Sequence, residues 1–178
     1  MHASADPAPP VRAAATRADA AARLRTVNLT ACLLLLAQYL LGMAANLYVA
    51  LPAHHPGAGA SNYFAGIVSG LDWVIPDGAG WVAAHAALGL ALAVAALANI
   101  AFTWRRGSRL VTTTAVLGAL FIIGAGFNGA SFLNYGHNAS SLIMAVLWAF
   151  ALACYLTGLY LAHRPVAGRR AAARPRGR

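Results

Sequence analysis

Four long apolar runs, separated by clusters of arginine, constrain the fold of this sequence more than any other feature. A helix needs roughly 20 predominantly apolar residues to cross about 30 Å of hydrocarbon. Four segments meet that requirement: residues 27–51, 81–104, 110–133 and 139–162. We therefore expect an all-α protein, a four-helix antiparallel transmembrane bundle that the lipid bilayer solvates.

The composition excludes an ordinary soluble domain. Of the 178 residues, 60% are hydrophobic and only 10% are charged, and the mean hydropathy is +0.63. About a quarter of the residues of a soluble domain are charged. This chain has too few charges to cover itself with a surface that water would solvate.

The charges that remain predict the orientation in the membrane. All 13 basic residues are arginines, and they lie before the first apolar run, between the second and third, and after the fourth. Four crossings place these blocks on one side, which the positive-inside rule makes the cytoplasm. We expect an inner (plasma) membrane protein with cytoplasmic termini. Because the arginines alternate with Ala, Pro and Gly rather than with aromatic residues, we do not expect nucleic-acid binding.

The chain divides into three parts. Residues 1–26 are predicted to be a partly disordered cytoplasmic tail, residues 27–162 the transmembrane domain, and residues 163–178 a basic cytoplasmic tail. The end of the first tail either continues into the first span as a helix or lies on the headgroups. In the first external loop, apolar residues recur at spacings of three and four from Phe64 to Ile75. This spacing predicts a short interfacial helix that Ser61 or Asn62 caps.

Polar residues are predicted to form a layer near the external ends of the spans. Asn46, His85 and Asn128 lie about five residues inside their spans, which corresponds to a depth of about 7 Å, and Ser141 opens the fourth span. Polar side chains in a bilayer usually face the bundle interior or a watery cavity. We therefore expect any site to open outward, and we expect the cytoplasmic half of the bundle to be nearly featureless.

Two segments resemble the haem-binding four-helix membrane cytochromes, namely the cytochrome b561 type and one half of haem A synthase. The segments are Trp-Val-Ala-Ala-His-Ala-Ala-Leu-Gly at residues 81–89 and Gly-His-Asn leading into Ser-Ser-Leu-Ile-Met at residues 136–144. In those families histidines on alternate helices ligate the haem iron. The resemblance implies one haem b site with His85 and His137 as axial ligands, and Met144 as a substitute ligand.

The sequence departs from those families, and other interpretations stay open. The cytoplasmic halves of the spans carry no histidine for a second haem, and there is no C-x-x-C-H motif. His85 would instead hold helices together by hydrogen bonds to Asn46, Asn128 or a serine. Two weaker hypotheses are metal sites: one formed by the histidines and aspartates of the first external loop, and one formed by His85 with two methionines.

Glycines within the spans predict close helix contacts. Gly42, Gly89, Gly118 and Gly158 stand within apolar runs, and small side chains let helices approach closely in lipid. No nucleophile elbow, phosphate loop or metalloprotease motif occurs. We interpret the chain as a small integral membrane protein to which the sequence assigns no enzyme activity, a subunit or accessory protein with membrane protein partners. The alternative is a haem b-binding cytochrome-like protein.

Overall fold

The structure is a computed structural model that describes residues 9–163, and all secondary structure in this part is helical. The predictions for residues 1–8 and 164–178 therefore lie outside the described residues. There are five helices along the described chain. They are α1 (Pro9–Tyr48), α2 (Tyr63–Asp77), α3 (Gly80–Arg106), α4 (Arg109–Tyr135) and α5 (Asn138–His163).

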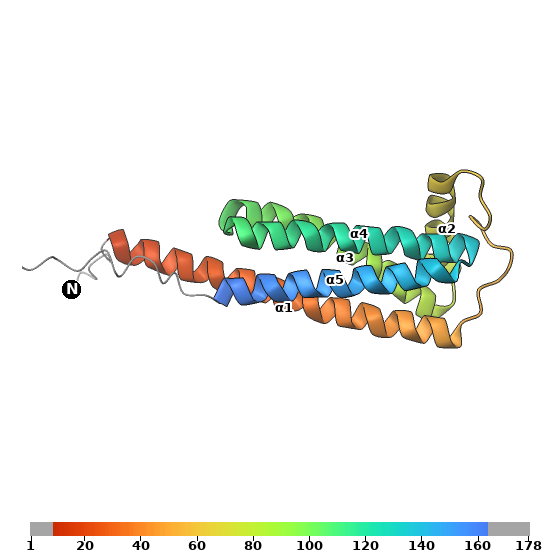
Figure 1. The fold of residues 1–178 in the computed structure, drawn as a ribbon, viewed down its shortest axis with the longest axis horizontal. Helices are drawn as coiled ribbons and strands as arrows, with labels where there is room; N and C mark the ends of the chain where they lie inside the picture. The colour runs from red at the N-terminus through yellow and green to blue at the C-terminus, as the bar shows by residue number, and fades with distance from the viewer. Residues whose placement is uncertain (1–8, 164–178) are drawn as a thin grey trace, which may run out of the picture.

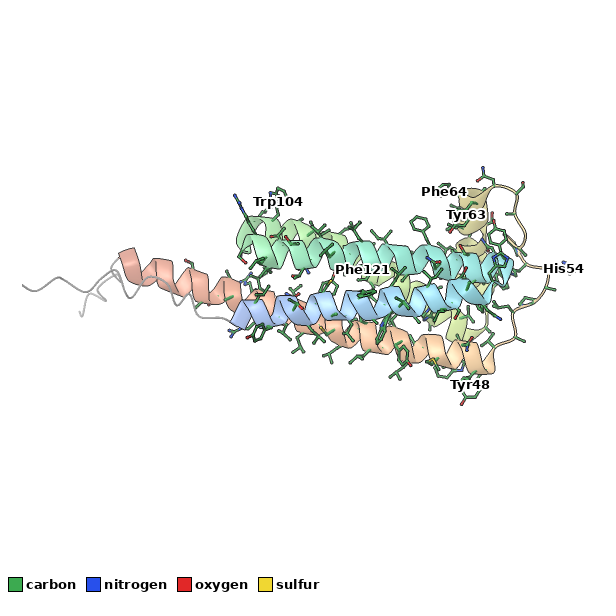
Figure 2. All side chains as sticks on the ribbon, viewed as in Figure 1. Tyr48, His54, Tyr63, Phe64, Trp104 and Phe121 are labelled. Atoms are coloured by element: carbon green, nitrogen blue, oxygen red, sulfur yellow. The ribbon has the colours of Figure 1, made fainter. Side chains whose placement is uncertain are left out.

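Four of these helices, α1, α3, α4 and α5, are long and apolar enough to cross a membrane. Their outward faces carry large hydrophobic side chains that water would not solvate, such as Leu40, Val94 and Leu142, each more than 60% exposed. Figure 2 shows side chains projecting outward from the bundle of long helices. Aromatic side chains lie near both ends, with Trp104 and Tyr48 each 76% exposed, as is common at the two interfaces of a bilayer.

The four long helices lie side by side along the longest axis of the molecule (Figure 1). α1 packs against α3 and α5, and α4 packs against the same two helices. Their inward faces meet in one apolar core that includes Leu35, Leu92, Ala119, Ala151 and Tyr155. We call the end with Arg105 and Arg109 the arginine end, and the opposite end, where α2 lies, the α2 end.

Turn chemistry in the sequence explains where the helices stop. α3 ends at Gly107, and Ser108 begins α4 by accepting a hydrogen bond from the backbone N–H of Val111 at 3.4 Å. At the other end of α4, Gly136 adopts φ = 65°. This left-handed conformation is favourable for glycine because it has no Cβ atom. The chain reverses there, so α5 runs back alongside α4.

The helix expected in the first long loop is α2, and Asn62 is its N-cap. The Asn62 side chain accepts a hydrogen bond from the N–H of Ala65 at 3.0 Å. α2 packs across one end of α3 and α4, with Gly66, Gly70 and Val74 buried. The α2 end is thus covered by a short helix, while α1 continues without interruption from Pro9 to Tyr48.

Candidate functional site

His85 forms a reciprocal pair with Gln38 where α3 packs against α1. Nδ1 of the imidazole lies 3.1 Å from the backbone carbonyl oxygen of Gln38. In return, the side-chain amide of Gln38 donates to the backbone carbonyl of His85 at 3.0 Å. Each residue thus bonds to the backbone of the other helix, and this is a cross-helix contact that the sequence analysis did not predict.

Two glycines make room for this pair. A Cβ atom on Gly42 would lie 2.8 Å from Cε1 of His85, and a Cβ atom on Gly89 would lie 2.9 Å from Nε2 of Gln38. The imidazole of α3 therefore packs on a glycine of α1, and the amide of α1 packs on a glycine of α3. The prediction that Gly42 and Gly89 are close-contact positions is confirmed.

The hydrogen bonds define the tautomer of His85. A carbonyl oxygen only accepts, so Nδ1 carries the proton and donates to Gln38. The lone pair of Nε2 then faces the amide nitrogen of Gln38, at a longer distance of 3.4 Å. Because α1 fills the space beside the imidazole, His85 could ligate a haem iron only if its hydrogen bonds with Gln38 were broken.

The other two residues that the resemblance suggested lie against different elements. Met144 on α5 packs on Gly129 of α4, whose Cβ atom would lie 3.2 Å from the methionine sulfur. His137 follows the end of α4 and stacks on Tyr135 with ring centroids 6.0 Å apart. Among the described residues, neither side chain forms a hydrogen bond or a ring contact with His85. Haem binding therefore stays a hypothesis from the sequence.

The polar residues that were predicted to form one layer have separate surroundings in the structure. Asn46 is exposed on α1. Asn128 donates to the carbonyl of Gly124 on its own helix at 2.9 Å, and Ser141 is half-buried at the start of α5. These three side chains lie at the α2 end of the helices but do not bond to His85 in the described part of the chain.

The loop before α2 is fastened to the end of α4. Nδ1 of His55 lies 2.9 Å from the carbonyl oxygen of Pro56, and Nε2 lies 3.1 Å from that of Leu133. The His55 ring also stacks on Trp73 of α2, with centroids 4.6 Å apart. Within residues 9–163, no three His, Cys, Asp or Glu side chains cluster as metal ligands would.

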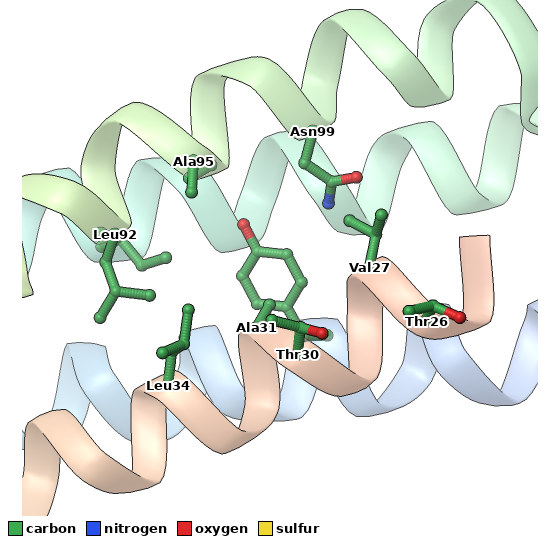
Figure 3. A pocket seen from close by; sticks show the side chains of 11 residues that line it. Thr26, Val27, Thr30, Ala31, Leu34, Leu92, Ala95 and Asn99 are labelled. Carbon is green, nitrogen blue, oxygen red and sulfur yellow. The ribbon is translucent and has the colours of Figure 1, made fainter. Parts of the chain in front are cut away.

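The half of the bundle at the arginine end, which was expected to be nearly featureless, contains buried polar side chains, among them Asn28, Asn99 and Thr103. A cavity of about 190 Å³ lies in that half, between α1 and α3. Figure 3 shows Leu92, Ala95 and Asn99 of α3 on one side of it and Thr26, Val27, Thr30, Ala31 and Leu34 of α1 on the other. Ile122 of α4 and Tyr155 of α5 complete the lining.

The interior of this cavity contains polar atoms without partners. Asn99 is 5% exposed and Tyr155 is 1% exposed. The hydroxyl of Tyr155 and the carboxamide of Asn99 lie near each other in the lining of the cavity. Nevertheless, among the described residues, neither the Tyr155 hydroxyl nor either polar atom of the Asn99 side chain makes a hydrogen bond of acceptable geometry. Buried polar atoms are nearly always hydrogen-bonded, so these atoms mark the cavity as a candidate binding site.

One of the two polar residues was detectable in the sequence. Asn99 lies on the same helical face as His85, Gly89, Leu92 and Ala96, because these residues recur at spacings of three and four. Tyr155 stands in an apolar run that gives no sign of which side faces inward. The cavity offers hydrogen bonds and apolar surface but no nucleophile paired with a base, so it is suited to binding.

Comparison with protein-family models, with curated proteins and with solved structures finds no match for this chain.

Proposed function

We propose that this chain is a four-span protein of the inner (plasma) membrane, with both termini in the cytoplasm and α2 lying in the outer interface. We propose further that it serves as a subunit or accessory protein of a larger membrane complex. The arginine blocks support the orientation. The absence of charged side chains within the spans argues against a proton-coupled transporter.

The observation that carries the proposed role is a stripe of exposed small side chains on α3. Its members recur at spacings of three and four, so they share one side of the helix and extend over about 21 Å. All five are exposed: Ala84, Ala87, Ala91, Ala95 and Ala98.

A second face of α3, with exposed Leu90, Val94 and Leu97, already presents bulky side chains to lipid. In a bilayer, association of helices depends on close packing, which small side chains allow. The alanine stripe is therefore the surface of α3 best suited to a helix of another protein.

Site-specific photo-crosslinking tests this role. A photoreactive residue is placed at Ala91, in the stripe, and as a matched control at Ala149, an exposed alanine of α5. We expect position 91 to capture another membrane protein in the native membrane and position 149 to capture none. A chain that captures nothing at position 91 and purifies alone would contradict the proposal. So would capture of only a second copy of this chain.

The orientation has its own test. Reporter domains fused after Gly107 and within the loop at Gly59 report which side of the membrane each position occupies. We expect the reporter at Gly107 to be cytoplasmic and that at Gly59 to be exported. An exported reporter at Gly107 would refute the proposed topology.

A further inference from the structure

We propose that the cavity between α1 and α3 binds a small hydroxylated aromatic molecule, of the phenol or quinol class, that enters from the lipid. This adds a ligand to the proposed structural role, and the two surfaces share one residue, Ala95, which belongs to the alanine stripe and also lines the cavity. The inference is based on three features of the cavity: its size, its polar atoms and its opening.

The size fits one aromatic ring. The cavity has a volume of about 190 Å³, and a cavity of about 150 Å³ lined by apolar side chains holds benzene. Leu34, Leu92, Ala96 and Ile122 supply apolar walls. A six-membered ring with one or two small substituents would fill this space and contact those walls.

The polar atoms match a single hydroxyl group. A hydroxyl donates one hydrogen bond and accepts two. It would donate to Oδ1 of Asn99 and accept from Nδ2 of Asn99 and from the hydroxyl of Tyr155. These are three atoms that lack partners in the described structure. A carbonyl group in the same place only accepts, so it would leave Oδ1 of Asn99 unsatisfied.

Water and lipid acyl chains fit less well. One water would pair with the same three atoms, but the rest of the cavity is lined mostly by apolar groups, where further waters would find few partners. An acyl chain would fill the apolar part and leave the buried carboxamide and phenol unpaired, which is costly. A ring that carries a hydroxyl satisfies both parts.

The cavity opens on the outer surface of the helix bundle. Thr26 and Thr30 of α1 and Ala95 of α3 line the cavity and are exposed, whereas Asn99 and Tyr155 are buried. The polar atoms therefore lie at the inner end of a passage between α1 and α3. In the proposed topology this passage opens to the cytoplasmic leaflet, where aromatic amphiphiles dissolve.

The test uses two probes that differ only in the group that meets the polar atoms. 4-Fluorophenol and 4-fluorotoluene are titrated against the full-length protein in detergent micelles, and the fluorine NMR signal is compared with that in empty micelles. We expect saturable, one-to-one binding of 4-fluorophenol. We expect 4-fluorotoluene to bind at least about fivefold more weakly because it leaves the buried polar atoms unpaired.

Variants assign the binding to this cavity. Asn99→Leu and Tyr155→Phe keep the shape of the side chains, and each should weaken 4-fluorophenol binding about fivefold or more. Asn128→Leu, at the α2 end, is the matched control and should bind as the unaltered protein does. The proposal is overturned if 4-fluorophenol shows no saturable binding, if 4-fluorotoluene binds equally well, or if both cavity variants bind like the unaltered protein.

Discussion

Nδ1 of His85 and the backbone carbonyl oxygen of Gln38 lie 3.1 Å apart, and the Gln38 amide lies 3.0 Å from the backbone carbonyl oxygen of His85. The two hydrogen bonds join α1 to α3 at a point where Gly42 and Gly89 allow both side chains to fit. The most conspicuous histidine of the sequence therefore has a structural partner on the neighbouring helix.

The first prediction concerns those glycines. Gly42→Ala and Gly89→Ala should each lower the free energy of unfolding by about 1–3 kcal/mol, because the new methyl group overpacks the contact. Gly126→Ala is the control, since a Cβ atom there would have no neighbour within 4 Å. It should leave stability unchanged or raise it by up to about 1 kcal/mol through helix propensity. Unfolding in detergent measures all three, and equal stability of the Gly42 and Gly126 variants would contradict the predicted contact.

The second prediction concerns the two hydrogen bonds between His85 and Gln38. Interhelical hydrogen bonds in membranes contribute about 0.6 kcal/mol on average and up to about 1.7 kcal/mol. Because each side chain bonds to a backbone carbonyl that remains when the other residue is replaced, His85→Ala and Gln38→Ala should each lower the free energy of unfolding by about that amount or more, and the two effects should be close to additive. If neither substitution lowers the free energy of unfolding in detergent, the two hydrogen bonds do not form.

The third prediction addresses haem. Because Gln38 and Gly42 occupy the space beside the imidazole, we expect the protein purified from haem-replete cells to show no Soret band. A visible absorption spectrum measures this directly. A Soret band that disappears in His85→Ala but persists in His54→Ala would contradict the prediction and restore the cytochrome interpretation.

Local sequence signals predicted some of these features, and tertiary packing determined the rest. Runs of apolar residues are sufficient to indicate four long helices, and Asn62 was one of two expected caps for α2. The rotation of each helix was less predictable. α5 and the part of α1 that follows Arg25 are apolar on nearly every side, so no apolar stripe shows which face packs inward. Asn46 was consequently expected inside the bundle but is exposed.

The partners of buried polar residues also required the structure. Gln38 and His85 are 47 positions apart in the sequence, and only the register of α1 against α3 brings them together. The third span was predicted to end at residue 133, so Asn134 lay outside it. It is buried between the loop and α2 instead, with Gly57, Gly66 and Gly70 close to its side chain. Contacts of this kind depend on how the loop folds back.

The fourth prediction concerns the loop before α2. His55→Ala removes both its stacking on Trp73 and its two contacts with carbonyl oxygens, whereas His55→Phe retains an aromatic ring for stacking. Hydrogen exchange of residues 52–62 should accelerate about two- to tenfold in His55→Ala, because a hydrogen bond contributes about 0.5–1.5 kcal/mol. The acceleration should be smaller in His55→Phe. Unchanged exchange in His55→Ala would show that His55 does not hold the loop.

The last prediction contrasts two asparagines buried at the arginine end. Asn28 donates to the backbone carbonyl of Leu24 at 2.8 Å, whereas the amide of Asn99 has no partner in the described chain. Burying a polar group without a partner costs about 1–3 kcal/mol. In protein without added ligand, Asn99→Leu should therefore raise the free energy of unfolding by about 1 kcal/mol or more.

Asn28→Leu should have the opposite effect. It removes an existing hydrogen bond. It also introduces a branched side chain into a tight space, since a Cβ atom on Gly158 would lie 2.8 Å from Oδ1 of Asn28. We expect a loss of about 1 kcal/mol or more. Unfolding of both variants under identical detergent conditions tests the contrast. If Asn99→Leu destabilises the protein as much as Asn28→Leu, the carboxamide of Asn99 has a partner in the folded protein, and the cavity would be already satisfied without a ligand.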